Sequence, residues 1–189
     1  MRITKEQARQ NHDRVVAAAS ELFRSRGFDD VRVSEITGAA GLTHGGFYNH
    51  FESKDDLALQ ALESAFSQMA AERAKSADLA EMLTLYLSQA SRRGPGKSCP
   101  AAALAGEVGR GDEGLKAVFA DGLEGMIRSV EAGLPATAAG NLSARERAVD
   151  VVGRMVGALA LSRAVPESSG LGDEILQVAL RSCLAEIAG

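Results

Sequence analysis

The sequence predicts an all-helical protein, and its composition supports this before any element is placed. Aromatic residues make up only 4% of the 189 residues, Trp is absent, and Ala is abundant. Sheets favour aromatic and β-branched residues, whereas Ala has the highest helix propensity, so this balance favours packed helices. Hydrophobic residues at 46% and charged residues at 24% are close to the globular average. We expect about nine helices in two domains, residues 1–54 and 55–189.

The charge is divided unevenly between these two parts of the chain. The formal net charge of −4 alone argues against a nucleic-acid binder, because neutralising phosphates takes clustered Lys and Arg. Residues 1–54, however, hold eight basic and seven acidic residues, a net charge of +1, and all three histidines. The remainder holds 13 basic and 18 acidic residues, a net charge of −5. The acidity therefore belongs to the C-terminal part, and the whole-chain charge does not exclude DNA.

The first predicted helix covers residues 5–26. Apolar residues recur at helical spacing from Val15 to Phe23, and charged residues occupy the other faces. Gly27 is a natural stop, because glycine adopts a positive φ without steric cost. His12, on this helix, is predicted to be an ordinary surface residue.

Two short helices follow the first. Residues 33–40 form one, with Ser34 near its N-cap, and Gly41 breaks it. Thr43 is expected to cap the other, residues 44–51. Two short helices joined through Gly form a helix-turn-helix pattern, whose second helix can enter a DNA major groove.

The remaining helices are longer and separated by loops that Gly and Pro mark. Ser53 is expected to cap a long helix that runs to about Lys75. A capping box at residues 143–146 opens another helix, and Pro100 suits a first turn, where its missing N–H costs nothing. Helices are predicted over residues 78–90, 99–108, 113–132, 144–165 and 171–187, with a loop at 91–98.

Residues 10–60 resemble a known family. The run Ala-Ala-Gly-Leu-Thr-His-Gly-Gly-Phe-Tyr-Asn-His-Phe at 39–51, with Val-Ser-Glu-Ile before it and Ser-Lys-Asp-Asp-Leu after it, resembles the TetR/AcrR family of bacterial transcriptional repressors. The resemblance implies an N-terminal DNA-binding domain and a C-terminal helical domain that dimerises and binds a small-molecule inducer. The implied partner is double-stranded, palindromic operator DNA. His44 departs from the pattern, because many members carry Lys or a small polar residue there, so operator preference is not carried over.

The helix-turn-helix residues suit contact with DNA. Gly45 and Gly46 leave a surface without side chains, and their cost of roughly 1 kcal/mol each relative to Ala is unusual in a purely structural helix. Asn49 could bond adenine edges, and the resemblance implies phosphate contacts for Tyr48, His50 and Lys54. The alternative is that these are ordinary surface residues and that the glycines only mark a loop. The complete predicted DNA-binding set is Arg32, Ser34, Thr43, His44, Gly45, Gly46, Tyr48, Asn49, His50 and Lys54.

The last two predicted helices have broad apolar surfaces. A helix that is hydrophobic on more than one face must bury both, which indicates a subunit interface. Gly153 and Gly157 would allow a close helix approach. The resemblance implies that this pair forms half of a four-helix dimer bundle, and the alternative is a fully intramolecular core.

Cys99 opens the predicted helix 99–108. The segment Ser-Cys-Pro-Ala-Ala-Ala-Leu-Ala-Gly-Glu resembles a subgroup of the family in which a Cys opens the sixth helix, and some members sense electrophiles or oxidants through it. A helix N-terminus stabilises a thiolate, and Arg92, Arg93 and Lys97 would help. The alternative is a small apolar filler or a helix cap. Cys183 is predicted to be a packing residue.

The resemblance also implies an apolar cavity for an effector in the C-terminal domain. The candidate residues have the spacing of ordinary core, which is the alternative for each of them. They are Cys99, Met82, Tyr86, Leu104, Phe119, Leu123, Met126 and Met155.

Other classes of protein are disfavoured. The chain lacks HExxH, a phosphate-cradling Gly loop and Gly-x-Ser-x-Gly, so we expect no enzyme, no catalytic residue and no cofactor. Two cysteines are too few for a zinc site, and we expect no metal. No apolar run approaches about 18 residues and no signal peptide is evident, so we expect no membrane partner and a cytoplasmic location. The rival function is a helical ligand-binding or scaffold protein that no longer binds DNA.

Overall fold

The computed structural model of the chain is all-helical, as predicted. It describes residues 4–135 and 142–188, and within these ranges no β-strand is present. The same residues form nine α-helices and three short 3-10 helices. In chain order they are α1 (Lys5–Arg26), α2 (Val33–Ala39), η1 (His44–Asn49), α3 (Lys54–Arg73), α4 (Leu79–Tyr86), α5 (Gln89–Arg93), η2 (Pro95–Lys97), α6 (Pro100–Val108), α7 (Glu113–Gly133), α8 (Ala144–Arg163), η3 (Glu167–Ser169) and α9 (Leu171–Ala188).

Helix α1 begins and ends where the sequence predicts. The Thr4 hydroxyl accepts the Gln7 N–H at 3.1 Å, and the Gln7 side-chain oxygen accepts the Thr4 N–H at 3.1 Å. At the other end Gly27 has a φ of +86°, a conformation that other residues rarely adopt. Both ends of α1 are therefore determined by local chemistry.

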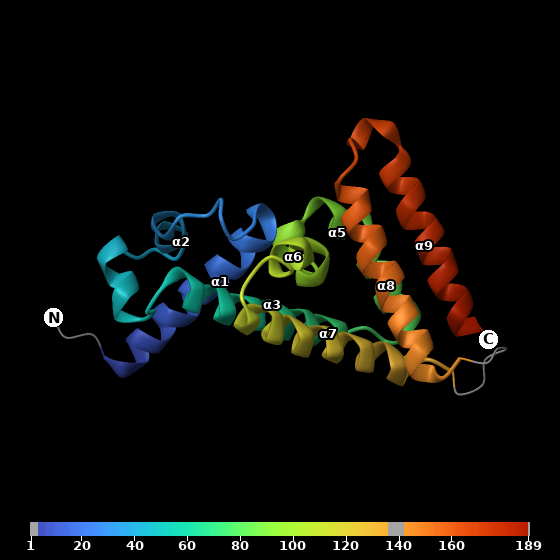
Figure 1. The fold of residues 1–189 in the computed structure, drawn as a ribbon, viewed down its shortest axis with the longest axis horizontal. Coiled ribbons are helices and arrows are strands. Elements are labelled where there is room, and N and C mark those ends of the chain that lie inside the picture. Colours follow the sequence, from blue (N-terminus) through green and yellow to red (C-terminus); the bar gives the residue numbers. More distant parts are fainter. Residues whose placement is uncertain (1–3, 136–141, 189) are drawn as a thin grey trace.

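Helices α1, α2, η1 and the first turns of α3 enclose one hydrophobic core. Figure 1 shows these elements gathered at one end of the molecule. Helix α3 takes part in both cores, because Leu57, Ala58 and Ala61 belong to the N-terminal one while Leu62 and Phe66 belong to the C-terminal one. The other members of the N-terminal core are Val15, Val16, Ala19, Phe23, Val31, Ile36, Ala40, Phe47 and Phe51.

The helix-turn-helix differs from its prediction at both caps. Ser34 is not the N-cap of α2; Arg32 is, and the Glu35 carboxylate accepts the Arg32 N–H at 2.9 Å. Thr43 precedes η1 without capping it through its side chain. The second helix is a 3-10 helix that ends at Asn49, which is consistent with the low helix propensity of Gly45 and Gly46.

The predicted helix 78–90 and the predicted loop 91–98 are wrong in detail. Helix α4 ends at Tyr86, and the Ser88 hydroxyl accepts the Ser91 N–H at 3.2 Å, which starts α5. Part of the expected loop 91–98 is therefore helical, because it contains the end of α5 and the whole of η2. The short helix η3 lies between the predicted helices 144–165 and 171–187, where no helix was predicted. Helices α3 and α8 end two residues earlier than predicted, at Arg73 and Arg163.

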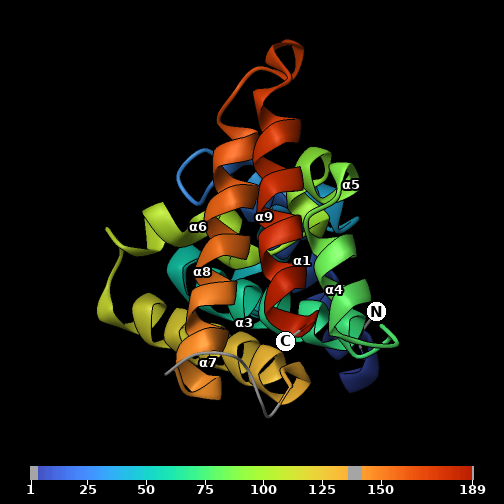
Figure 2. The same cartoon turned by 90° about the vertical axis from the view of Figure 1, so that its right-hand side faces the viewer.

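The C-terminal domain is built on long helices that pack side by side. Helices α3 and α7 run together beneath α6, and α8 and α9 form an antiparallel pair at the end opposite the N-terminal domain (Figure 1). Figure 2 looks onto that end, with α8 and α9 at the front. None of the helices in the described ranges is long and apolar enough to cross a membrane.

The two domains meet closely at η2. Gly96 is buried against α1, and a Cβ placed on it would lie 2.9 Å from the Glu21 carbonyl oxygen and would overlap the Ser25 hydroxyl. Only glycine fits there without displacing α1. A second contact joins the turn after α1 to α6, because the Glu107 carboxylate accepts the Phe28 N–H at 2.6 Å.

Candidate nucleic-acid interface

The η1 helix is held by its aromatic residues. Phe47 and Phe51 are buried, with ring centroids 5.3 Å apart, and they anchor η1 on the N-terminal core. Because their side chains point inward, Tyr48 and Asn49 lie on the outer surface, where Tyr48 is 66% exposed. The core thus fixes the orientation of the face that η1 presents to solvent.

The two glycines of η1 lie on an open surface. A Cβ on Gly45 would have no neighbour within 4 Å, and one on Gly46 would meet only the Thr43 hydroxyl at 3.8 Å. Internal packing therefore does not require glycine at either position. Their absence of side chains leaves a bare stretch of backbone beside the exposed Thr43, Tyr48 and Asn49.

Lys54 is placed by a helix cap that the sequence predicts correctly. The Ser53 hydroxyl accepts the Asp56 N–H at 3.0 Å, so α3 begins at Lys54. Asp55 and Asp56 occupy the same turn, and their negative charges already balance the positive end of the helix dipole. The Lys54 ammonium, more than the helix N-terminus, is thus the feature that can attract a phosphate here.

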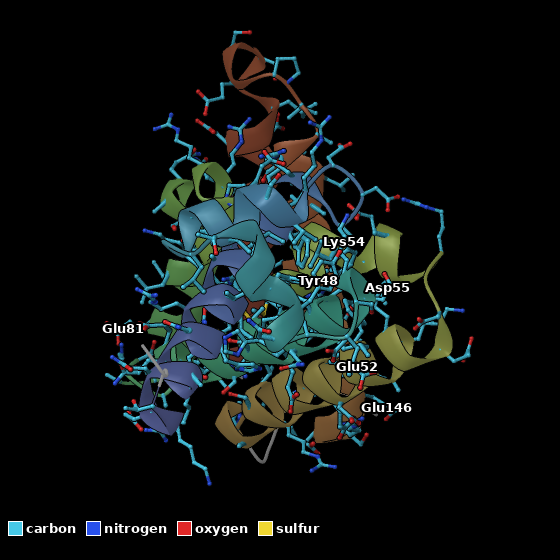
Figure 3. The ribbon with its side chains drawn as sticks, turned by 90° about the vertical axis from the view of Figure 1, so that its left-hand side faces the viewer. Tyr48, Glu52, Lys54, Asp55, Glu81 and Glu146 are labelled. Atoms are coloured by element: carbon cyan, nitrogen blue, oxygen red, sulfur yellow. The ribbon has the colours of Figure 1, made fainter. Side chains whose placement is uncertain are left out.

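Figure 3 shows Tyr48 and Lys54 on the same face, the end of the molecule that the N-terminal domain forms. Glu52 and Asp55 lie on this face too, so it is not broadly basic. Neutralisation of a DNA backbone here would rest on a few placed groups.

Arg32 and Ser34 are exposed at the start of α2. The local structure is supported by an ion pair of Arg26 with Glu35 at 2.8 Å. The hydrogen bond from Arg26, helped by the Arg32 N–H, lowers the pKa of the Glu35 carboxyl. The Glu35 carboxylate thus binds the Arg26 side chain and the Arg32 backbone N–H, and the Arg32 side chain is exposed to solvent.

The histidines are placed differently from one another. His50 is half-buried, and the side chain of His44 lies outside the described part of the structure. The prediction for His12 is incomplete, because its ring is half-buried and stacks on Phe51 with centroids 4.8 Å apart. Sequence spacing does not reveal that contact, since the two residues are far apart in the chain.

The candidate effector residues separate into two groups in space. Met82, Tyr86 and Cys99 border one cavity of about 450 Å³, which we call the Arg73 cavity; its wall also includes Met69, Arg73 and Lys97. Leu104, Met126 and Met155 are fully buried in the core, and Phe119 and Leu123 pack against that core half-buried. These last five do not border the Arg73 cavity.

Cys99 lies in surroundings that the sequence does not predict. It precedes α6 and is 2% exposed, and burial raises the pKa of its thiol despite nearby N–H groups, the Tyr86 hydroxyl and Arg163. Arg92 instead bonds the Ser162 carbonyl and Asp173, and Arg93 pairs with Glu167. Arg24, Arg73 and Arg163 lie close enough to interact with the thiol, and none of them was predicted, whereas the predicted Lys97 borders the same cavity as Cys99.

A buried aromatic anchor, a bare and exposed turn-helix surface and an adjoining capped helix together form a helix-turn-helix unit, the arrangement that DNA-binding domains use. Residues 15–61 match the family profile described as "Bacterial regulatory proteins, tetR family". Residues 15–61 therefore resemble the DNA-binding domain of TetR-family regulators, and the chain has the helical fold of solved TetR-family structures.

Curated relatives match only the N-terminal region. The HTH-type transcriptional repressor DhaR of Mycobacterium sp. (strain GP1) is 40% identical over 55 residues, which are 29% of this chain and 28% of DhaR. The HTH-type transcriptional regulator AcrR of Shigella flexneri is 38% identical over 56 residues, 30% of this chain and 26% of AcrR. The chain thus matches between a quarter and a third of the length of these relatives.

Solved structures match over the whole chain. A TetR transcriptional regulator from Chloroflexus aurantiacus J-10-FL has a TM-score of 0.79 at 23% identity, covering 97% of this chain and 96% of that one. The reduced form of NemR from E. coli has a TM-score of 0.74 at 20% identity, covering 94% and 97%. At these identities the likeness concerns the fold.

Proposed function

We propose that the chain is a homodimeric repressor that binds a palindromic operator and leaves it when a small molecule acts on its C-terminal domain. The observation that carries the proposal is the bare surface of η1, where two glycines have no packing role beside exposed polar residues. Residues 1–54 would form the DNA-binding unit and residues 55–189 the effector-binding and dimerising unit, with the first turns of α3 shared. DNA as the partner implies action in the cytoplasm.

The proposed DNA contacts divide by chemistry. Lys54 and Arg32 would neutralise phosphates, and Ser34, Thr43, Tyr48 and His50 would donate hydrogen bonds to the backbone. Asn49 and His44 would face base edges, and Gly45 and Gly46 would let the backbone approach closely.

The outer face of α8 and α9 supports the dimer. Leu161 is 60% exposed, Val178 50% and Leu171 45%, and they border an apolar hollow together with Gly153 and Gly157. A Cβ on either glycine would meet nothing within 4 Å, so neither residue serves the contact between α8 and α9. A second copy of this face would cover the exposed side chains and use both glycines, and it would place two η1 helices on one face of a DNA duplex.

A gel shift with DNA from upstream of the chain's own gene, measured over a range of salt concentrations, tests DNA binding. Lys54→Ala should weaken binding and lower the salt slope by about one, because one phosphate contact is lost. Tyr48→Phe should weaken binding by roughly 0.5–1.5 kcal/mol without changing the slope, since only a neutral hydrogen bond is lost.

Arg128→Ala is the matched control, because Arg128 is an exposed cation of α7 that pairs with Glu124. Unchanged affinity in both DNA-face variants would overturn the contact assignment. Absence of any salt-sensitive specific binding by the wild type would favour the ligand-binding or scaffold alternative.

A thiol-reactive compound is the second kind of effector we propose, and Cys99 is its target. The burial that raises the pKa of Cys99 makes the thiolate scarce at neutral pH, so alkylation by iodoacetamide should be slow and speed up on local opening. If alkylation releases operator DNA from wild type and equally from Cys99→Ser, the thiol-sensing role is wrong. Release by alkylation only in proteins that retain Cys99 would support it.

A further inference from the structure

Arg73, the last residue of α3, is a half-buried cation, and two of its nitrogen atoms are buried without a hydrogen-bond partner. Its Nε and Nη1 atoms are shielded from solvent, and no described side chain or carbonyl accepts a hydrogen bond from them. The neighbouring Glu72 is engaged with Lys75 at 2.6 Å. Leaving buried donors of a charged group unpaired costs free energy, so this arrangement calls for an explanation.

Two arginines that are buried, Arg24 and Arg92, show how such a side chain can be satisfied within the fold. Arg24 donates to the carbonyls of Ser20 and Ser98, at 3.0 and 2.9 Å. Arg92 donates to the Ser162 carbonyl at 2.8 Å and pairs with Asp173 at 2.9 Å. Arg73 differs from both in having no such contact, and it is also the one that borders a cavity with the Tyr86 hydroxyl.

The Tyr86 hydroxyl is a second polar group that the fold leaves unsatisfied. Tyr86 is 8% exposed, and its hydroxyl has no partner of good hydrogen-bond geometry, with only the weakly polar Cys99 thiol beside it. Behind these residues, Nη1 of Arg163 also lacks a partner, although the other donors of Arg163 bond the Ser91 carbonyl, the Arg92 carbonyl and the Ser98 hydroxyl. Lys97 adds a further positive charge at the wall. The polar end of the Arg73 cavity therefore offers donors and positive charge, and the acidic Glu72 in the same wall is already paired with Lys75.

Much of the remaining wall is apolar, although Ser76 and Ser91 also border the cavity. Met69, Met82 and Leu85 line it, and Leu85 is 58% exposed at its edge. A volume of about 450 Å³ is in the range of small-molecule sites. A ligand that fills it would place an apolar body against the methionines and a negative group against Arg73.

We propose that the Arg73 cavity binds a small amphiphilic carboxylate, whose carboxylate accepts hydrogen bonds from Arg73 and Tyr86 and whose apolar chain lies on Met69, Met82 and Leu85. The proposal rests on the proposed function in treating this ligand as the effector, and it names the chemical class. Arginine presents a planar fork that matches a carboxylate, and a charge-assisted bond of this kind is about twice as strong as a neutral one.

The position of the cavity explains how binding of such a ligand would affect the N-terminal domain. Ser98 borders the cavity, its carbonyl accepts from Arg24 of α1 at 2.9 Å, and its hydroxyl accepts from Arg163. A carboxylate beside Arg73 would attract Arg163 and Lys97 as well, and so bias the contacts that hold segment 95–98 against α1. The ligand would shift the equilibrium only through such a difference between two states.

Calorimetric titration of the full chain without DNA tests the ligand class. The probes are hexanoate, hexanol and hexylamine, which share the chain and differ in the head group. We expect saturable binding of hexanoate, binding of hexanol weaker by at least about tenfold, and none of hexylamine. Equal affinity for hexanoate and hexanol, or no saturable binding of hexanoate, would overturn the proposal.

Arg73→Met and Tyr86→Phe locate the site, with Arg128→Met as the control because that arginine is exposed on α7. Arg73→Met should abolish hexanoate binding and Tyr86→Phe should weaken it several-fold, while the control binds as the wild type does. Arg73 makes no hydrogen bond or ion pair within the described structure, so the ligand-free Tm of Arg73→Met should stay close to that of the wild type, and lost binding with an unchanged Tm could not reflect unfolding. Hexanoate affinity retained in Arg73→Met would place the ligand elsewhere and reject the site.

The titration is independent of DNA. Hexanoate binding through Arg73 with no effect on operator binding would support the site and contradict its regulatory role. A protein that binds operator DNA and no carboxylate would retain the proposed function and lose this inference.

Discussion

The two hydrophobic cores of the chain are built from different side chains. The N-terminal core is aromatic around η1, with Phe23, Phe47 and Phe51 buried together. The C-terminal core is made mostly of Leu, Val, Ala and Met, and a cavity bordered by Arg73, which has no hydrogen-bond partner in the described structure, lies at its edge. Rigid aromatic packing holds the proposed DNA-facing surface in one orientation, whereas flexible methionines and a cavity leave room for a ligand. The packing of the N-terminal domain thus favours one fixed orientation of η1, and the packing of the C-terminal domain favours adjustment to a ligand.

The largest expected difference between the cores follows from truncating one residue in each. Phe47→Ala should lower the free energy of unfolding by about 3–5 kcal/mol, because Phe47 is 1% exposed and anchors η1. Met82→Ala should cost no more than about 2 kcal/mol, at the lower end for such a change, since Met82 already borders open space. Urea denaturation measures both, and equal losses would contradict the comparison.

A smaller effect of opposite sign is expected on the DNA-facing surface. Gly46→Ala should raise the free energy of unfolding by roughly 0.4–1 kcal/mol, because the space is open and Ala restricts the unfolded chain. The same change should weaken operator binding by filling the bare surface. Thermal melts and gel shifts on one preparation provide the two measurements. A variant that is less stable, or that binds DNA as tightly as the wild type, would show that Gly46 has a structural role.

The smallest effect concerns acid stability at the start of α2. The pKa of Glu35 is lowered by its hydrogen bond from Arg26 and by the Arg32 N–H, so the carboxylate stabilises the fold above its unfolded pKa of about 4.3. That contribution is lost as the pH falls through the lower, folded pKa. Glu35→Gln should thus slightly lower the urea concentration at the midpoint of unfolding at neutral pH. In the variant, this midpoint should also fall less steeply as the pH is lowered. Glu113→Gln removes an exposed ion pair with Lys116 and is the control. It should change the midpoint of unfolding at acidic pH less than Glu35→Gln does.

Much of the fold could be predicted from sequence because local chemistry determines it. Thr4, Gly27, Ser53 and Ser143 each stop or start a helix through their own hydrogen bonds or backbone freedom. The break between α4 and α5 was missed because residues 87 and 88 are Leu and Ser, and no Gly or Pro marks it. The 3-10 form of η1 was missed because glycine pairs predict weak helicity without predicting which helix forms.

The candidate effector site was harder to predict than the DNA-facing surface. A cation such as Arg73 at a helix C-terminus is favourable in any helix, so its sequence position does not indicate a ligand. Arg92 and Arg93 are close to Cys99 in sequence, yet their side chains are engaged with α9 and η3. Arg73 and Arg163 are far from Cys99 in the chain, and only the packing of α3 and α8 around it brings them near.

The close contact at Gly96 has a mechanical consequence. Where two elements touch through long side chains, a small displacement of one is absorbed by rotation about side-chain bonds. Gly96 has no such bonds, and backbone of η2 lies directly against backbone and side chains of α1. A displacement of η2 toward α1 is therefore opposed directly by the α1 backbone, whereas a separation of the two is opposed by the hydrogen bond from Arg24 to the Ser98 carbonyl.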